Sequence, residues 1–348
     1  MAKKRSSSSA RDGGDDVTRG HLPVLPDASV RALGLVPGGV VVDCTAGGGG
    51  HLRLFAEAVG STGRVIGVDR DERAFADDAA GGVAKQYPQI TLVRRPFSEV
   101  REALNDVGVD RVDAVFADLG VSSFQLDEGE RGFSFRFDAP LDMRMDRRSG
   151  ETAAELIARL EEEDLANLIY LYGEERLSRR IAKVLKRELP TTTDRLKDLV
   201  ASCFNGPRGR IHPATKTFQA LRIAVNGELD QLQTLLAALP NVLLTGGRAG
   251  LLTFHSLEDR LVKTAFLNAG YEVAGRKPIV ADDDELELNP RARSAKLRVA
   301  TFDPAFEGGP RRHKSKYADM ANRDDDDDNN YSDDNNSDDT DTDEGGDA

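Results

Sequence analysis

The 348-residue sequence predicts an α/β protein in which a doubly wound parallel sheet is interrupted by an all-helical insertion. Two observations carry this prediction. Short β-branched runs alternate with helical patterns in the first third of the chain, as in parallel βαβ units. The alternation then stops over residues 125–212 and returns after residue 213.

Four apolar runs near the start of the chain are bounded by glycine, proline or aspartate, as short strands usually are. They cover residues 40–42, 64–68, 90–93 and 112–116. Later runs at 250–254 and 296–302 restore strand character. We therefore expect one sheet, built from residues 19–124 and 213–305.

The intervening segment carries apolar residues at helical spacing and no convincing strand. It predicts helices over residues 152–171, 177–189 and 192–204, the last opened by a cap around Thr192. One long helix is expected after Pro213, because apolar residues recur there every three or four positions up to Leu239.

Charge is distributed unevenly. The chain has 60 acidic and 47 basic residues, and 13 of the acidic ones lie in residues 324–348 without a single Lys or Arg. The remainder is neutral and can still bind a polyanion. We expect disordered ends at 1–18 and 324–348 and a basic linker at 306–323.

Several classes of protein are disfavoured by composition. No apolar run approaches the roughly 18 residues of a membrane span, and residues 1–16 lack the apolar core of a secretory signal. Cys44 and Cys203 have no CxxC spacing, which argues against a disulfide framework or a zinc site. A cytoplasmic protein without membrane contact or a required metal is expected.

A glycine-rich segment, residues 43–51 (DCTAGGGGH), occupies the first predicted strand-to-helix turn. A dinucleotide fingerprint would need a third glycine at position 52 or 53, where Leu52 and Arg53 stand, and a Walker A loop would need GK[ST]. An adenosine ligand without a pyrophosphate, such as S-adenosylmethionine, fits better. Asp69, ending the second strand, can accept hydrogen bonds from a ribose. A purely structural turn is the alternative.

Other candidate site residues follow later strands. Asp118 ends the fourth strand at the expected reversal of strand order, where open α/β sheets bind ligands. Asp118 is a candidate to bind the amino group of the methyl donor S-adenosylmethionine, or to accept a proton from an amine substrate. Phe97 is placed to cover an adenine or to join the core. His255 follows a late strand and either contacts a substrate base or is a satisfied hinge residue.

At these residues the chain resembles the bacterial 16S rRNA cytosine-N4 methyltransferase family, called RsmH or MraW. The resemblance covers residues 20–302 and rests on blocks longer than a generic glycine loop. They include 20–25 (GHLPVL), 48–51 (GGGH), 118–123 (DLGVSS), 131–135 (RGFSF), 140–146 (PLDMRMD), 218–226 (FQALRIAVN), 254–260 (FHSLEDR) and 289–298 (NPRARSAKLR).

The resemblance implies a class I S-adenosylmethionine-dependent methyltransferase fold. It further implies a cytosine N4 in the decoding region of 16S rRNA, within the small ribosomal subunit, as acceptor, and an RNA-binding role for the helical insertion at 125–212. The family's cofactor positions fall on seven residues here: Gly49, Gly50, His51, Asp69, Phe97, Asp118 and Gln125. Of these, His51 and Gln125 come from the resemblance alone. Asp118 and His255 are the candidate catalytic residues, and a homodimer is left open.

Phe124 stands where the family usually has proline, in the loop that carries Gln125. Residues 118–121 read DLGV, not the Asn/Asp-Pro-Pro-aromatic loop of many amino-group methyltransferases. The geometry by which Asp118 would accept hydrogen bonds must therefore differ from theirs.

Two rival functions remain open on the sequence. One is a methyltransferase for a small molecule, with the insertion as a lid. The other is a non-catalytic RNA-binding assembly factor that retains a cofactor fold. Residues 289–316 carry a net charge of +6 and either contact phosphates or form a solvated strip. The polar residues Gln219, Arg222 and Asn226 share a helix face, for which an internal network joining the helix to the sheet is favoured over RNA contact.

Overall fold

The computed structural model describes residues 22–122, 125, 128–205, 212–273, 275 and 277–307. The predicted disordered ends and nearly all of the basic linker lie outside these residues.

The described strands form one sheet in the order β3-β2-β1-β4-β5-β7-β6. Their bounds are β1 (Val40–Asp43), β2 (Arg64–Asp69), β3 (Ile90–Arg94), β4 (Val112–Asp118), β5 (Leu243–Thr253), β6 (Tyr271–Glu272) and β7 (Lys296–Phe302). The strands β1 to β5 are parallel, and β7 runs antiparallel to both β5 and β6. The order reverses between β1 and β4, which confirms the doubly wound prediction.

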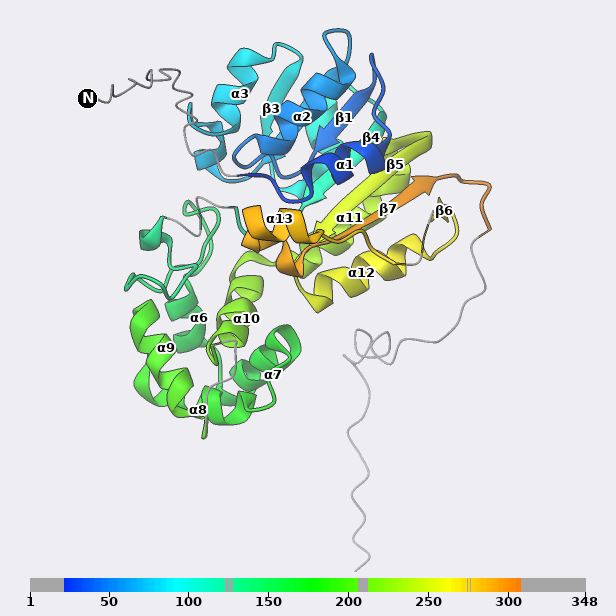
Figure 1. The fold of residues 1–348 in the computed structure, drawn as a ribbon. Helices are drawn as coiled ribbons and strands as arrows, with labels where there is room; N and C mark the ends of the chain where they lie inside the picture. The colour runs from blue at the N-terminus through cyan, green and yellow to red at the C-terminus, as the bar shows by residue number, and fades with distance from the viewer. Residues whose placement is uncertain are drawn as a thin grey trace, which may run out of the picture. The chain divides into compact units, whose positions relative to one another are not determined.

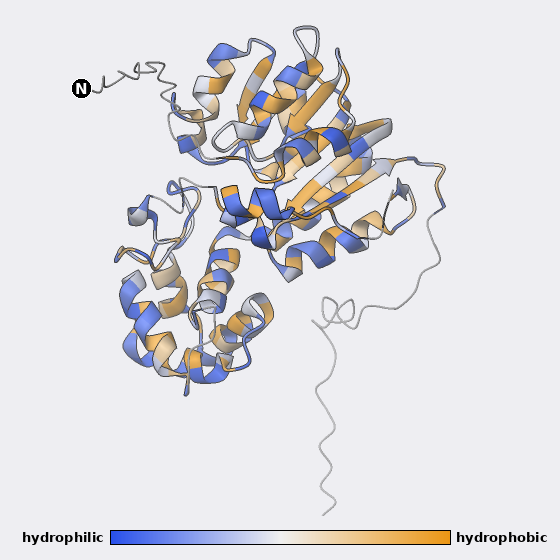
Figure 2. Ribbon diagram, viewed as in Figure 1, coloured by the Kyte–Doolittle hydropathy of each residue, from blue (hydrophilic) through white to orange (hydrophobic). Residues whose placement is uncertain are grey.

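Helices cover both faces of the sheet (Figure 1). They are α1 (Pro26–Leu33), α2 (Gly50–Val59), α3 (Ala80–Gln86), α4 (Val100–Asp106), α11 (Glu228–Val242), α12 (Ser256–Phe266) and α13 (Asp283–Leu288), with the short 3-10 turns η1 (Glu72–Phe75), η2 (Phe97–Glu99) and η4 (Pro290–Ser294). Successive strand residues join different hydrophobic clusters. Val41 and Val65 pack with α1 and α2, whereas Val42 and Ile66 pack with α4, α11 and α12. The strands are accordingly hydrophobic on both faces (Figure 2).

The helical insertion contains α6 (Ala153–Arg159), α7 (Glu162–Gly173), α8 (Ser178–Glu188) and α9 (Thr193–Ser202), preceded by the 3-10 turn η3 (Gly129–Arg131). The predicted single helix over 152–171 is wrong, because Leu160 adopts an extended ψ of 146° and ends α6. A new helix begins at Glu162, whose acidic first turn complements the helix dipole. Thr192 caps α9 as expected, accepting a hydrogen bond from the Arg195 N–H.

The long helix predicted after Pro213 is also two helices, α10 (Thr215–Asn226) and α11. They meet at Gly227, whose φ of 58° lies in the left-handed region and ends α10. Phe218 and Leu221 of α10 belong to the hydrophobic cluster of the insertion, whereas Leu235 of α11 packs on the sheet. The change of hydrophobic cluster therefore lies at Gly227.

The strand predicted at 250–254 begins earlier, at Leu243, and β6 was not predicted. Cys44 and Cys203 are both buried and free. No helix among the described residues combines the length and the apolar character that crossing a bilayer requires.

Candidate active site

A cavity of about 350 Å³ opens at the carboxyl ends of β1, β2 and β4, beside the reversal of strand order. Ligands of open α/β sheets bind at this position, and the volume lies within the roughly 300–1,000 Å³ typical of cofactor sites. The cavity lining includes six of the residues expected from the sequence: Gly50, His51, Asp69, Phe97, Asp118 and Gln125. It is therefore the candidate active site.

The loop after β1 brings backbone to the cavity. Gly47 has a φ of 47° and donates its N–H to Asp69 Oδ2 at 2.9 Å. A Cβ on Gly48 would meet nothing within 4 Å, whereas one on Gly49 would lie 2.6 Å from Val83 Cγ2. Gly48 lines the cavity, while Gly49 is required for the packing of the start of α2 against α3.

Asp69 lies at the end of β2 and holds the glycine loop in place. Its Oδ1 accepts the Asp71 N–H at 2.8 Å, in addition to the Gly47 contact at Oδ2. Each oxygen keeps acceptor capacity for one more donor. Burial raises the pKa of Asp69 to about 6. Hydrogen-bond donors of a ligand in the cavity would favour the ionised form of this carboxyl and lower its pKa again.

His51 is a neutral ring next to Asp118. Its Nε2 lies 3.1 Å from the Val24 carbonyl oxygen; because a carbonyl only accepts, Nε2 carries the hydrogen and Nδ1 the lone pair. Burial lowers the pKa of His51 to about 4. The lone-pair nitrogen Nδ1 lies 3.8 Å from Asp118 Oδ2.

Asp118 keeps 27% of its side chain exposed and lines the cavity. Burial raises the pKa of Asp118 well above its usual value, and the nearby carboxylates of Asp43 and Glu258 raise it further. In the ligand-free site its ionised form is therefore less favoured than in an exposed aspartate. A positive charge in the cavity would favour the carboxylate instead.

Asp43, which the sequence analysis did not single out, ends β1 as Asp69 and Asp118 end β2 and β4. It is 1% exposed, and its Oδ1 accepts the backbone N–H and the hydroxyl of Thr45 at 3.0 and 3.2 Å. Its Oδ2 is buried with no hydrogen-bond partner among the described residues. Burial raises the pKa of Asp43 to about 7. The Thr45 hydroxyl oxygen also accepts the Asp118 N–H at 2.7 Å, linking two of these acids.

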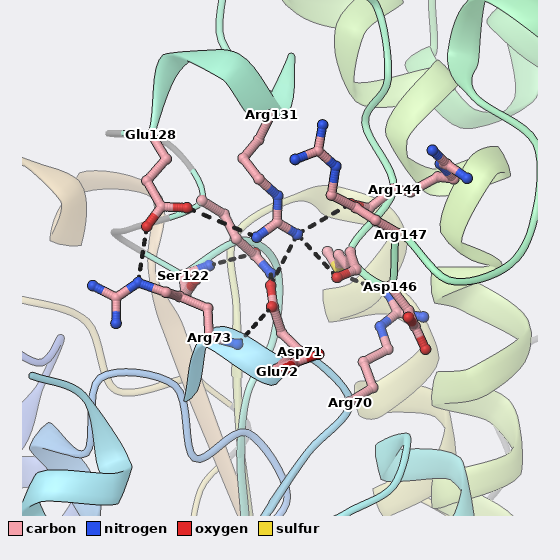
Figure 3. Close-up of polar contacts among 12 residues, drawn as sticks. Arg70, Asp71, Glu72, Arg73, Ser122, Glu128, Arg131, Arg144, Asp146 and Arg147 are labelled. Carbon is pink, nitrogen blue, oxygen red and sulfur yellow. Dashed lines mark hydrogen bonds and ion pairs between the residues drawn. The ribbon is translucent and has the colours of Figure 1, made fainter. Parts of the chain in front are cut away.

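Gln125 lines the cavity and is fixed by two partners. Its Nε2 donates to Asp71 Oδ2 at 2.7 Å, and its Oε1 accepts the Ser122 N–H at 3.0 Å. Asp71 also faces Arg131, whose Nη2 lies 3.0 Å from the same carboxylate oxygen. The loop after β4 is thus anchored to the loop after β2 (Figure 3).

Arg131 extends this anchor to the helical insertion. Its buried guanidinium donates to the carbonyl oxygens of Arg144 and Met145 at 3.1 and 2.9 Å. Glu128 lies beside it and pairs with Arg73 at 2.9 Å (Figure 3). Asp71 and Arg131 were not predicted as site residues, since nothing in the local pattern joins positions 60 residues apart.

His255 does not line the cavity, although its neighbour Phe254 does. It is the N-cap of α12, and its Nδ1 accepts the Glu258 N–H at 3.4 Å. Its Nε2 lies 3.2 Å from Glu258 Oε1. The structure thus makes His255 the cap of α12, while its Nε2 is buried without a hydrogen-bond partner among the described residues. A contact of His255 with the substrate base stays a prediction. Phe97, by contrast, reaches the cavity from the start of η2.

A buried polar cluster lies behind the cavity. The side chains of Glu228, His255 and Glu258 bring ligand atoms within 4.8 Å of one another, a proximity that the sequence spacing did not reveal. Arg222 pairs with both oxygens of Glu228 at 2.8 Å, so a protein cation already compensates this charge.

The other polar residues of α10 make internal contacts. Asn226 donates to the Met143 carbonyl oxygen at 2.7 Å and accepts the Met145 N–H at 2.8 Å, and Gln219 donates to the Tyr172 carbonyl oxygen at 3.0 Å. The expectation of an internal network on this helix is confirmed, but these contacts join α10 to the insertion and not to the sheet.

Comparison with known proteins identifies the family of this chain. Residues 18–303 match the MraW methylase family model. The chain belongs to this family. The "Ribosomal RNA small subunit methyltransferase H" of Sorangium cellulosum is 51% identical over 286 residues, which cover 80% of this chain and 90% of that protein. The protein of the same name from Picosynechococcus sp. is 50% identical over 294 residues, covering 82% and 98%.

Among solved structures, TrmN from Thermus thermophilus matches with 15% identity and a TM-score of 0.40, covering 80% of this chain and 48% of that one. The fold assignment therefore rests on the strand order and on the family. Together these confirm the resemblance stated above, the class I S-adenosylmethionine-dependent methyltransferase fold and the methyltransferase class of enzyme.

The cavity suits S-adenosylmethionine, the methyl donor of this enzyme class. Because Gly48 has no side chain, a ligand can approach the backbone of the cavity wall closely at this residue. Asp69 can still accept hydrogen bonds from a ribose. The buried Asp43 Oδ2 and the buried Ser122 Oγ both lack hydrogen-bond partners among the described residues. Acids whose ionised form is disfavoured in the ligand-free protein match a ligand that carries a sulfonium charge.

Proposed function

We propose that this protein transfers a methyl group from S-adenosylmethionine to the exocyclic N4 of a cytosine in the decoding region of small-subunit (16S) rRNA. The observation that carries the proposal is an intact donor cavity in a chain about 50% identical, over at least 90% of their length, to relatives named as small-subunit rRNA methyltransferases.

The donor is held by residues of the glycine loop and of three strand ends. Asp69 would accept hydrogen bonds from the ribose, Phe97 would cover the adenine, and Asp118 would face the methionine end of the donor. His51 and Gln125 shape the walls. Gly50 lets the start of α2 pack closely on Pro23, because a Cβ there would lie 3.2 Å from that ring, and Gly49 acts indirectly through the packing of the helix on α3.

Asp118 is the candidate proton acceptor. Cytosine N4 is a weak nucleophile because its lone pair is delocalised into the ring, so hydrogen-bond acceptors around the amino group assist the attack. S-adenosylmethionine supplies a methyl group made electrophilic by the sulfonium. That positive charge favours the ionised form of Asp118, and the carboxylate takes the proton that N4 loses. Alignment of N4 with the methyl carbon at about 3 Å supplies much of the acceleration.

The insertion at 125–212 binds the RNA, and the target base is turned out of its stack to reach the cavity. This assignment favours an RNA substrate over a small molecule with a helical lid. It follows that the enzyme works in the cytoplasm, where the small ribosomal subunit is its partner. A homodimer stays a prediction.

The test compares Asp118→Asn with Asp284→Asn, a matched change at an exposed position of α13. We expect Asp118→Asn to retain RNA binding but to lose at least a hundredfold in methyl transfer to small subunits from a strain lacking this gene. Mass mapping of the RNA locates the modified nucleotide. Unchanged modification in Asp118→Asn, or transfer to free cytidine without RNA, would contradict the proposal.

A further inference from the structure

Helix α8 (Ser178–Glu188) has two faces of opposite character. Ile181, Ala182 and Leu185 are fully buried, and the helix packs against α6, α7 and α9. This burial explains why α8 is held firmly on the insertion. Its other face is available to solvent.

The solvent face is positively charged. Residues 176–187 contain six Lys or Arg and no Asp or Glu. Five of these six are exposed, and four of the five are here called the α8 cation face: Arg176 in the preceding turn, and Arg179, Arg180 and Lys183 on the helix. None of the four side chains forms an ion pair with a carboxylate among the described residues.

Neighbouring cations on the insertion are neutralised. Arg187 and Arg195 both pair with Glu188, at 3.0 and 2.5 Å, and Lys197 pairs with Asp194. The charge of the α8 cation face therefore stands uncompensated. Unpaired surface cations in one row raise the local potential and attract a polyanion.

The basic strip predicted near the end of the fold is less available. Lys296 and Arg298 both pair with Asp259, at 3.3 and 2.6 Å, and Arg291 lines the cavity. Residues 308–316 of that strip lie outside the described residues. Among the described parts of the chain, α8 therefore carries the stronger case for contact with phosphates.

We propose that the α8 cation face binds backbone phosphates of small-subunit RNA away from the nucleotide that enters the cavity. The proposal rests on the proposed function and deepens it. Arg179 and Lys183 are one helical turn apart, about 6 Å along the axis, and Arg180 lies beside them. Long flexible cations on a convex helix suit the sugar-phosphate backbone more than base edges, which folded RNA hides in its deep, narrow groove.

The test replaces three of these side chains at once, in Arg179→Gln/Arg180→Gln/Lys183→Gln. Glutamine has nearly the same helix propensity, so α8 is retained. The matched control, Arg31→Gln/Arg53→Gln/Lys263→Gln, removes the same charge from exposed positions of the α/β part. Circular dichroism and calorimetry with S-adenosylmethionine verify that both variants fold and bind the donor as the wild type does.

Binding to transcribed 16S rRNA is measured from 0.05 to 0.4 M salt. We expect the α8 variant to lower the slope of log affinity against log salt by about 2 to 3, and to bind roughly a hundredfold more weakly at 0.1 M salt. In methyl transfer to small subunits its KM rises while kcat is retained, because the α8 cation face does not line the cavity. The control keeps the wild-type slope and KM.

A wild-type slope in the α8 variant would overturn the inference, as would an equal loss in the control. Weaker binding to intact subunits with unchanged binding to the transcript would also overturn it, in favour of a protein partner. Binding is measured independently of turnover, so an inactive wild type would refute the proposed function while the slope still decides the role of α8.

Discussion

Replacing Arg131 by methionine tests how firmly the helical insertion anchors the active-site loops. The substitution keeps an unbranched apolar stem and removes the guanidinium group with its charge and hydrogen bonds. Asp71, which is 4% exposed, then loses its buried cation. The carbonyl oxygens of Arg144 and Met145 lose a donor as well.

Removing one partner of a buried ion pair costs about 3–5 kcal/mol. At about 2.1 cal/mol/K of unfolding entropy per residue, a folded part of about 280 residues gains roughly 0.6 kcal/mol/K on melting. We therefore expect Arg131→Met to lower the melting temperature by about 5–8 °C. The matched change Arg94→Met breaks a pair with Glu72, which is 77% exposed, and costs less than about 1 kcal/mol, or under about 2 °C.

The assay is differential scanning calorimetry together with donor titration. Arg131→Met also weakens S-adenosylmethionine binding, because Asp71 holds Gln125 and thereby the loop after β4. In a double-mutant cycle with Asp71→Asn, the losses in stability are less than additive by about 1–3 kcal/mol. Melting of Arg131→Met within 2 °C of the wild type, or additive losses, would refute this account of the anchor.

Two further predictions concern the end of β1 and the glycine loop that follows it. The pKa of the Asp43 carboxyl is raised to about 7 in the folded protein. Because the unfolded chain releases this proton at a lower pH, the free energy of unfolding falls as pH rises from about 4 to about 7. Melting curves of the ligand-free protein between pH 4 and 8 should show this fall, and Asp43→Asn should flatten it. Gly48→Ala should keep the wild-type melting temperature and weaken donor binding. Gly49→Ala should lower the melting temperature, because the φ of Gly49 is 82° and a Cβ there would lie 2.6 Å from Val83. Equal melting temperatures for the two variants would contradict these different roles of the two glycines.

The sheet and the positions of the acids could be predicted from sequence because the signals are local. A β-branched run that ends in aspartate places that side chain at the carboxyl end of a parallel strand, and parallel strands bring these ends to one edge. Asp69 and Asp118 were found in this way. The cap at Thr192 is similarly local, since its hydrogen bond spans only three residues.

Features that depend on tertiary packing were not predictable in the same way. The break at Gly227 interrupts a continuous apolar pattern, because α10 packs on the insertion and α11 on the sheet. The pair of Asp71 and Arg131 joins two loops that no spacing rule connects. Asp43 was overlooked although it ends a strand as the other acids do, since its importance lies in a buried oxygen without a partner.

The charge arrangement of the site has a consequence for turnover. Methyl transfer converts a sulfonium into a neutral thioether, so the cavity holds a positive charge before the reaction and loses it afterwards. Burial raises the pKa values of both Asp43 and Asp118, and a positive charge nearby favours their ionised forms. The same buried acids that favour the donor thus have less attraction for the product. Burial of the acids, which weakens the ligand-free fold at neutral pH, in this way serves both donor selection and product release.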